Sequence, residues 1–363
     1  MPMDDFTYLY RYGQALGRTE AGWQFASRRL QKAAALAAVS AAWEMFRRDA
    51  GVGDIGPAHQ TTATDMPLLL TQDARRDAVL LWLADHGAAP IAEAAGTIAT
   101  MVGATHRFGT EQLDLLARAR AALVEAIASV SANEPEVDEP ATPPLAPLVM
   151  AIERLRGDAD FLEGQGGVVH HALPRGTLNH YVAAEPGGCW ALNLALLSAG
   201  VQPPLALPSV GLISRALFRA DLEAGEIEVR LIETAGAACD RTYATLCRMN
   251  EHIARGHDAL AHLSRNARAR EAWLLVAGLG ACTRTQLRRV LGLSRAGGDI
   301  QAHVLADAGL VALGAVGQIS WRALSAAAPV SPAPIDQVPL ANAVSDLDAS
   351  MAEINRLLAR IAT

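Results

Sequence analysis

The chain has 363 residues, a formal net charge of −7 at pH 7, 51% hydrophobic residues and 19% charged residues. This length allows two or three domains, and the composition is typical of a globular protein. No apolar run approaches the roughly 20 residues that span a bilayer, and the first residues show no basic segment followed by an apolar one. We therefore expect a cytoplasmic protein without a membrane span or a signal peptide.

Helix-forming residues are plentiful and strand-forming residues are sparse, so we predict a mainly α protein. The four cysteines include no C-x-x-C pair and lie in largely apolar surroundings. We therefore expect reduced, mostly buried thiols, with neither a zinc site nor disulfides. These cysteines are Cys189, Cys239, Cys247 and Cys282.

Residues 1–130 are predicted to form a helical domain. Apolar residues at helical spacing predict one long helix over 20–48, and the glycines at 51 and 53 end it. Thr71 is the predicted N-cap of the next helix. The remaining predicted helices of this domain cover 71–84, 91–102 and 110–130.

Residues 131–147 are predicted to form a linker, because they hold five prolines and four acidic residues. Such a segment can neither form a helix nor bury a core.

Residues 148–263 are predicted to form a mainly helical middle domain. Helices are expected over 148–155 and 210–222, and Asp240 is expected to cap a further helix. At 226–232 apolar residues alternate with charged ones, which is the period of a strand, so a short strand and a helix both remain open there.

Three histidines in the middle domain are the densest group of possible metal ligands, namely His170, His171 and His180. Metal binding or acid–base catalysis would require their side chains to converge. No H-E-x-x-H motif is present, and their spacing matches no metal motif. We therefore expect no metal site, no cofactor and no catalytic residues.

Residues 264–325 contain a series of helix caps and helix-terminating glycines that predicts three helices followed by a hairpin. An apolar helix is expected to end near Gly278 and Gly280, because glycine adopts the left-handed cap conformation. Thr283 is expected to cap a second helix and Ser294 a third, which Gly309 ends. Residues 310–313 and 317–321 then predict a two-stranded hairpin.

The same segment holds the pattern T-x-x-x-L-x-x-x-L-G-L-S-R-A from Thr283, followed by L-x-x-A-G-L-V from Leu305. This order resembles the winged helix-turn-helix domains of bacterial regulators, over residues 269–321. The resemblance implies that the third helix enters the major groove of DNA and that the hairpin is the wing.

The charge of residues 264–324 supports a nucleic-acid contact. Eight arginines face three acidic residues there, a net charge of +5, so the remainder of the chain carries −12. Arg295 and Gln301 are the predicted base-reading residues, since Arg pairs with guanine and Gln with adenine. The predicted phosphate contacts are Arg284, Arg288, Arg289 and Arg322.

A second linker is predicted over 326–339, followed by an amphipathic helix over 340–363. Apolar residues there step by four and three, as in a heptad seam. An isolated helix of this length is marginal in water, so the seam needs a partner. Both dimerisation in trans and docking on the same chain are open, and we favour a homodimer. The seam is Leu340, Val344, Leu347, Met351, Ile354, Leu358 and Ile361.

The segments ALFRADL (216–222) and HIARGHDALAHLSR (252–265) lead into this C-terminal region. This order is similar to the C-terminal half of Fic-like proteins, and to alphaproteobacterial proteins of unknown function that pair a helical domain with a helix-turn-helix. The Fic catalytic stretch H-P-F-x-D/E-G-N-G-R is missing, and residues 170–176 lack its acidic residue and its asparagine. The resemblance therefore implies a scaffold without AMP-transfer activity, and no catalytic residue carries over.

We predict a bacterial transcriptional regulator that binds double-stranded DNA as a homodimer, with no enzymatic activity. The alternatives are a protein-interaction adaptor with a winged helix, a degenerate Fic-like protein, and an enzyme that uses the three histidines.

Overall fold

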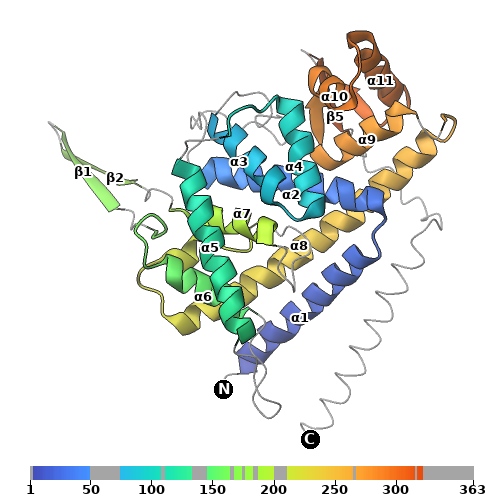
Figure 1. The fold of residues 1–363 in the computed structure, drawn as a ribbon. Helices are drawn as coiled ribbons and strands as arrows, with labels where there is room; N and C mark the ends of the chain where they lie inside the picture. The colour runs from blue at the N-terminus through green and yellow to red at the C-terminus, as the bar shows by residue number, and fades with distance from the viewer. Residues whose placement is uncertain are drawn as a thin grey trace, which may run out of the picture.

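A computed structural model describes residues 3–49, 74–107, 111–132, 145–163, 167–173, 176–182, 187–199, 211–264, 267–314 and 317–321. These residues form eleven α-helices, one 3₁₀-helix and five short strands, which confirms the predicted mainly α fold (Figure 1). Several predictions lie outside the described residues: Thr71, most of the linker at 131–147, Arg322, the linker at 326–339 and the heptad seam at 340–361.

The N-terminal region begins with two helices, α1 (Met3–Gln24) and α2 (Arg28–Asp49), so the single helix predicted over 20–48 is wrong. The chain reverses at residues 25–27. The Ser27 hydroxyl accepts a hydrogen bond from the Leu30 N–H at 3.2 Å, which satisfies a free donor in the first turn of α2. The break lets the two helices pack against different partners.

α1 packs along α8 (Ala224–Ala259), the longest helix of the described chain (Figure 1). The Thr19 hydroxyl lies 3.0 Å from the carbonyl oxygen of Cys239. A Cβ at Gly22 would lie 3.3 Å from Tyr243, and one at Gly236 would lie 3.7 Å from Tyr12. Tyr12, Thr19 and Gly22 of α1 thus contact Gly236, Cys239 and Tyr243 of α8, in that order. The two helices therefore run parallel.

α8 is continuous, so it resolves the open choice at 226–232 in favour of a helix, and the predicted cap at Asp240 is wrong. Ile227 and Leu231 are fully buried, whereas Val229 is 39% exposed. Burial therefore follows the four-residue spacing of a helix face rather than the two-residue alternation of a strand. Asp240 lies in the middle of this helix and caps nothing.

Five shorter helices complete the helical body. α7 lies among α2, α3 and α5. All residues of α7 from Cys189 to Ser198 are buried, and Trp190 meets Phe46 of α2 edge to face, with ring centroids 4.6 Å apart. A helix that is apolar on every side belongs in the centre of a core. The five are α3 (Ala74–His86), α4 (Ala89–Val102), α5 (Glu111–Ala132), α6 (Ala146–Leu155) and α7 (Cys189–Ala199).

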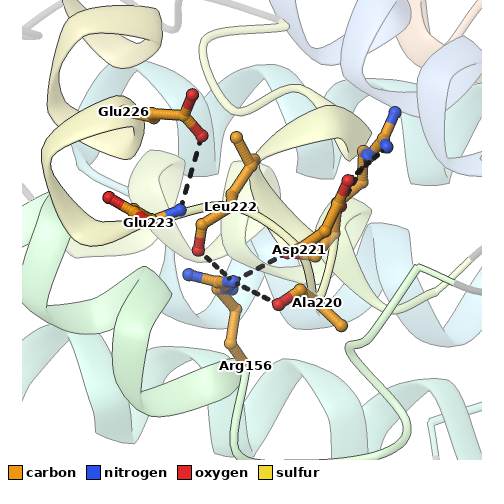
Figure 2. Close-up of polar contacts among 7 residues, drawn as sticks. Arg156, Ala220, Asp221, Leu222, Glu223 and Glu226 are labelled. Atoms are coloured by element: carbon orange, nitrogen blue, oxygen red, sulfur yellow. Dashed lines mark hydrogen bonds and ion pairs between the residues drawn. The ribbon is translucent and has the colours of Figure 1, made fainter.

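The helix predicted over 210–222 is wrong, because only the 3₁₀-helix η1 (Arg215–Phe218) forms there. The Asn193 amide accepts from the Ile213 N–H at 3.0 Å and donates to the Ile213 carbonyl at 2.7 Å, so helical bonds cannot use these groups. Figure 2 shows Arg156, at the end of α6, donating to the carbonyls of Ala220 and Leu222 before α8. At the start of α8 the Glu226 carboxylate accepts from the Glu223 N–H.

A two-stranded antiparallel hairpin, β1 (Gly167–Leu173) and β2 (Gly176–Val182), extends from the helical body (Figure 1). Val168 and Leu178 are exposed on it. No sequence pattern predicted these strands, which pair with no further strand among the described residues.

Residues 268–321, the C-terminal module, fold as α9 (Arg268–Leu279), β3 (Ala281–Thr283), α10 (Arg284–Leu291), α11 (Arg295–Asp307), β4 (Val311–Leu313) and β5 (Gln318–Trp321). α10 and α11 begin after the predicted caps Thr283 and Ser294, α9 ends at the predicted Gly280, and β4 and β5 form the predicted hairpin. α11 ends at Asp307, two residues before the predicted Gly309. β3 was not predicted. It pairs with β5, which gives a three-stranded antiparallel sheet in the order β3-β5-β4.

Two glycines bring α9 into close contact with the helical body. A Cβ at Gly278 of α9 would lie 2.9 Å from the Ala33 carbonyl of α2. A Cβ at Gly256 of α8 would lie 1.9 Å from Nε1 of Trp273 on α9. The indole N–H of Trp273 donates to the His252 carbonyl at 3.2 Å. The core of the module is therefore continuous with the core of the body.

Candidate nucleic-acid interface

The α10–turn–α11 unit is shaped by local side-chain caps. The Thr283 hydroxyl accepts from the Gln286 N–H at 3.2 Å, and the Gln286 side chain accepts from the Thr283 N–H at 2.8 Å, so both form a capping box. Gly292 ends α10 with a φ of 61°. Ser294 then caps α11 by accepting from the Gly297 N–H at 3.1 Å.

The two helices are held together by a small apolar core. Leu287 and Leu291 of α10 and Ala302 and Leu305 of α11 are buried in it. The first turn of α11 passes beside α10 at Gly298, where a Cβ would make an ordinary van der Waals contact with the Cβ of Arg288 at 3.5 Å. The two helices therefore bury their apolar positions against each other.

The outer face of α11 is open to solvent. Arg295, Ile300 and His303 are exposed, whereas Gln301 is half-buried. The His303 ring nitrogen Nδ1 lies 2.7 Å from the carbonyl of Asp299, four residues before it. Of the two predicted base-reading residues, Arg295 is therefore the more accessible.

Two of the predicted phosphate contacts have partners within the protein. Arg284 forms an ion pair with Asp299 of α11 at 3.1 Å. Arg289 is exposed, and its guanidinium donates to the carbonyl of Met101 at the end of α4 at 3.3 Å. This bond joins α10 to the helical body, so a phosphate contact by Arg289 would compete with it.

Arg288 and Arg295 differ from the other arginines of the module. Within the described ranges, neither forms a hydrogen bond or an ion pair. Arg268 pairs with Glu271 at 2.6 Å, and Arg270 donates to the carbonyls of Leu260 and Leu263. The cationic groups without a described partner thus lie on α10 and at the start of α11.

The hairpin formed by β4 and β5 lies beside this surface. The Gly314 N–H donates to the Gln318 carbonyl at 2.8 Å and closes the turn. Gly317 has a φ of 76° and would place a Cβ 3.7 Å from the side chain of Arg284.

At the far end of β5, Trp321 meets His252 of α8 with ring centroids 4.3 Å apart. Burial lowers the pKa of His252 below 6.5, and Arg255 and Arg248 lower it further, against Glu251.

The three histidines of the middle region lie on the β1–β2 hairpin. Nδ1 of His170 lies 2.7 Å from the side-chain oxygen of Asn179, and the strand register pairs His180 with Val169. His170 and His171 are neighbours in one strand, so they point to opposite faces. The part of the chain that the structure describes holds no group of three or more His, Cys, Asp or Glu residues that could bind a metal ion.

The cysteines are free thiols, as predicted, and three of the four are buried. Burial raises the pKa of Cys239 to about 11 and that of Cys282 to about 12. Both thiols are therefore protonated at neutral pH and are poor nucleophiles.

The partners of Arg284 and Arg289 were missed by the sequence analysis. Arg289 and Met101 are 188 positions apart, so no local pattern links them. Arg284 and Asp299 are 15 positions apart, and the Gly292 turn brings them together. The acidic residue on α11 was the available signal for an ion pair between the two helices.

No helix in the described ranges has both the length and the apolar character that crossing a membrane requires. A comparison of the sequence with models of known protein families gave no match, and a comparison with curated proteins also gave none.

Proposed function

We propose that the C-terminal module is a winged helix-turn-helix domain that binds double-stranded DNA, and that the protein is a bacterial transcriptional regulator. In this proposal α11 enters the major groove, α10 crosses the backbone and the β4–β5 hairpin is the wing. The observation that carries the proposal is the position of Arg288 and Arg295. They are the arginines of the module without a partner in the described chain, and they lie on α10 and at the first residue of α11.

The charges around α11 support the same surface. Arg295 is at the N-terminus of α11, where the helix dipole also attracts a phosphate. Asp299 would repel phosphates, but its ion pair with Arg284 offsets that charge. The exposed outer face of α11 holds no other carboxylate before Asp307. Gln301 and the exposed Arg295 remain the proposed base-reading residues, and Arg284, Arg289 and Arg322 the proposed additional phosphate contacts.

The test is fluorescence anisotropy with the full chain and labelled duplex DNA of random sequence, over a series of salt concentrations. We expect binding that weakens steeply with salt, because each phosphate contact releases a counterion. The Arg288→Gln/Arg295→Gln double variant should bind at least about tenfold more weakly, with a salt slope that is shallower by at least about 1 because the phosphate contact of Arg288 is lost.

The matched control is the Arg11→Gln/Arg230→Gln double variant. It makes the same change in net charge at two exposed arginines of α1 and α8, away from the module. It should bind DNA as the unsubstituted protein does. Equal losses in both double variants, or no binding at low salt, would contradict the proposal.

One observation favours a second candidate, the protein-interaction adaptor. Ile300 is 58% exposed on the outer face of α11. An apolar side chain at this position fits a protein partner, and in DNA it can contact only apolar groups such as the thymine methyl. A protein that binds no DNA, but in which Ile300→Asp abolishes association with a defined partner, would support the adaptor.

A further inference from the structure

A cavity of about 500 Å³ lies between the start of α2, the end of α8 and the start of α9. Arg29 lines it from α2, Ile253 and His257 from α8, and Arg268 and Leu274 from α9. This volume is within the range of about 300–1,000 Å³ that small-molecule sites occupy. The cavity is therefore large enough for a small organic molecule.

The apolar part of the cavity is formed by Ile253, Leu260, Trp273 and Leu274. Ile253 and Leu274 are partly buried, and their inner sides pack on a second core cluster that includes Leu30 and Met249. The close contact between Gly256 and Trp273 holds the walls from α8 and α9 together. A ligand would thus meet an apolar surface that is already in place.

The polar part of the cavity is mainly cationic. Three arginines and one carboxylate line it, so their formal charges sum to +2. The carboxylate, Glu271, is already paired with Arg268 at 2.6 Å. Arg29 is exposed and forms no hydrogen bond or ion pair with a described residue.

Arg270 is a second arginine that lines the cavity. One terminal nitrogen of its guanidinium donates to the carbonyls of Leu260 and Leu263, at 2.9 and 3.0 Å, which fixes the group at the edge of the cavity. Its Nε is inaccessible to solvent, as are those of Arg156 and Arg284, so the terminal nitrogens are the groups of Arg270 that a ligand can reach.

We propose that this cavity is a binding site for a small organic anion with an apolar body, such as an aromatic carboxylate. Arg29 and Arg270 bind the anionic group, and the apolar body packs on Ile253, Leu274 and Trp273. Glu271 repels an anionic ligand only weakly because it is paired with Arg268, and the net positive charge of the lining disfavours a cationic ligand. The proposal does not depend on whether the module binds DNA.

The experiment is isothermal titration calorimetry of the full chain with 2-naphthoate and with its neutral counterpart 2-naphthamide. We expect saturable binding of naphthoate, and at least tenfold weaker binding of the amide, because a hydrogen bond to a charged group is stronger than one to a neutral group. Arg29→Gln should reduce the affinity for naphthoate by about tenfold or more and leave the amide unaffected.

Two further variants make the result specific to the cavity. Arg28→Gln changes the same charge at the neighbouring exposed arginine of α2, which does not line the cavity, and should bind naphthoate normally. Ala267→Phe adds a large side chain at a partly exposed lining position and should abolish binding of both probes. Equal affinity for the two probes, equal effects of Arg28→Gln and Arg29→Gln, or no saturable binding of naphthoate below about 1 mM would overturn the proposal.

Discussion

Asp299 lies on the helix that the proposed function places against DNA, where an isolated carboxylate would oppose binding. Its ion pair with Arg284 is only partly buried, with side-chain exposures of 40% and 31%. Such pairs contribute about 1 kcal/mol or less to stability. The pair therefore sets the charge of the surface more than it stabilises the fold, and its effect should be visible in binding.

We expect Asp299→Asn to strengthen DNA binding, because the substitution removes a negative charge and releases Arg284 for a phosphate. The salt slope measured by anisotropy should become steeper by about 1. Asp307→Asn removes the same charge from an exposed position at the end of α11 and serves as the control. Identical gains from the two substitutions would mean that net charge alone, and not the release of Arg284, determines the effect.

His252 predicts a dependence of stability on pH. Its pKa in the folded protein is lowered, chiefly by burial, whereas in the unfolded chain it stays near 6.5. Below about pH 6.5 the unfolded chain therefore binds a proton that the folded protein does not, and the free energy of unfolding falls. Urea unfolding at pH 7.5 and pH 5.5 should show a smaller fall for His252→Gln than for the unsubstituted protein. His262→Gln, at an exposed position, should keep the original difference.

At the scale of elements, Gly256 determines how closely α8 and α9 pack. Alanine normally favours a helix over glycine by about 1 kcal/mol. A methyl group at this position would overlap the Trp273 indole, and overpacking of this kind costs about 1–3 kcal/mol. We therefore expect Gly256→Ala to lower the melting temperature, measured by circular dichroism.

Gly225 offers the matched control in the same helix. No atom lies within 4 Å of a Cβ built there, so Gly225→Ala should leave the melting temperature unchanged or raise it. If Gly256→Ala also raised the melting temperature, the close contact between α8 and α9 would not require glycine at position 256.

The elements that the sequence predicted correctly are those with local causes. The boundaries of α10 and α11 depend on Thr283, Gly292 and Ser294, each of which acts within three residues of its own position. The reversal at 25–27 was missed although the Ser27 cap of α2 is a local signal for it. The pairing of α1 with α8, whose contacts lie about 220 positions away, has no such signal. The η1 segment was missed for the same reason, since Asn193 holds it from 20 positions upstream.

In the candidate site, too, features with local causes were predicted and features that depend on distant contacts were missed. The position of Arg295 at the start of α11 follows from the predicted cap at Ser294. The internal partners of Arg284 and Arg289 depend on the packing of α10 against α11 and α4, which spacing within one helix does not encode. The cavity beside Arg29 joins three helices and had no sequence signal.

At the scale of the whole molecule, the heptad seam predicts self-association. We expect the full chain to be a dimer and Leu347→Asp/Leu358→Asp to be monomeric, because two charges in the seam cannot be buried without partners. Light scattering after size-exclusion chromatography measures this directly. Ser345→Asp, which places a charge outside the seam, should remain dimeric. If the double variant stays dimeric, the seam does not form the dimer interface. Docking of the seam on its own chain is then the alternative.

The pairing of α1 with α8 also has a consequence for synthesis. The first helix of the chain leaves the ribosome some 200 residues before its packing partner begins at Ala224. At about 5–20 residues per second, α1 spends roughly 10–40 s exposed. During that interval its apolar side, including Tyr12 and Ala15, has no native surface to cover it. A nascent chain that stalls before α8 should therefore be a strong substrate for chaperones, and one that stalls after it a weak one.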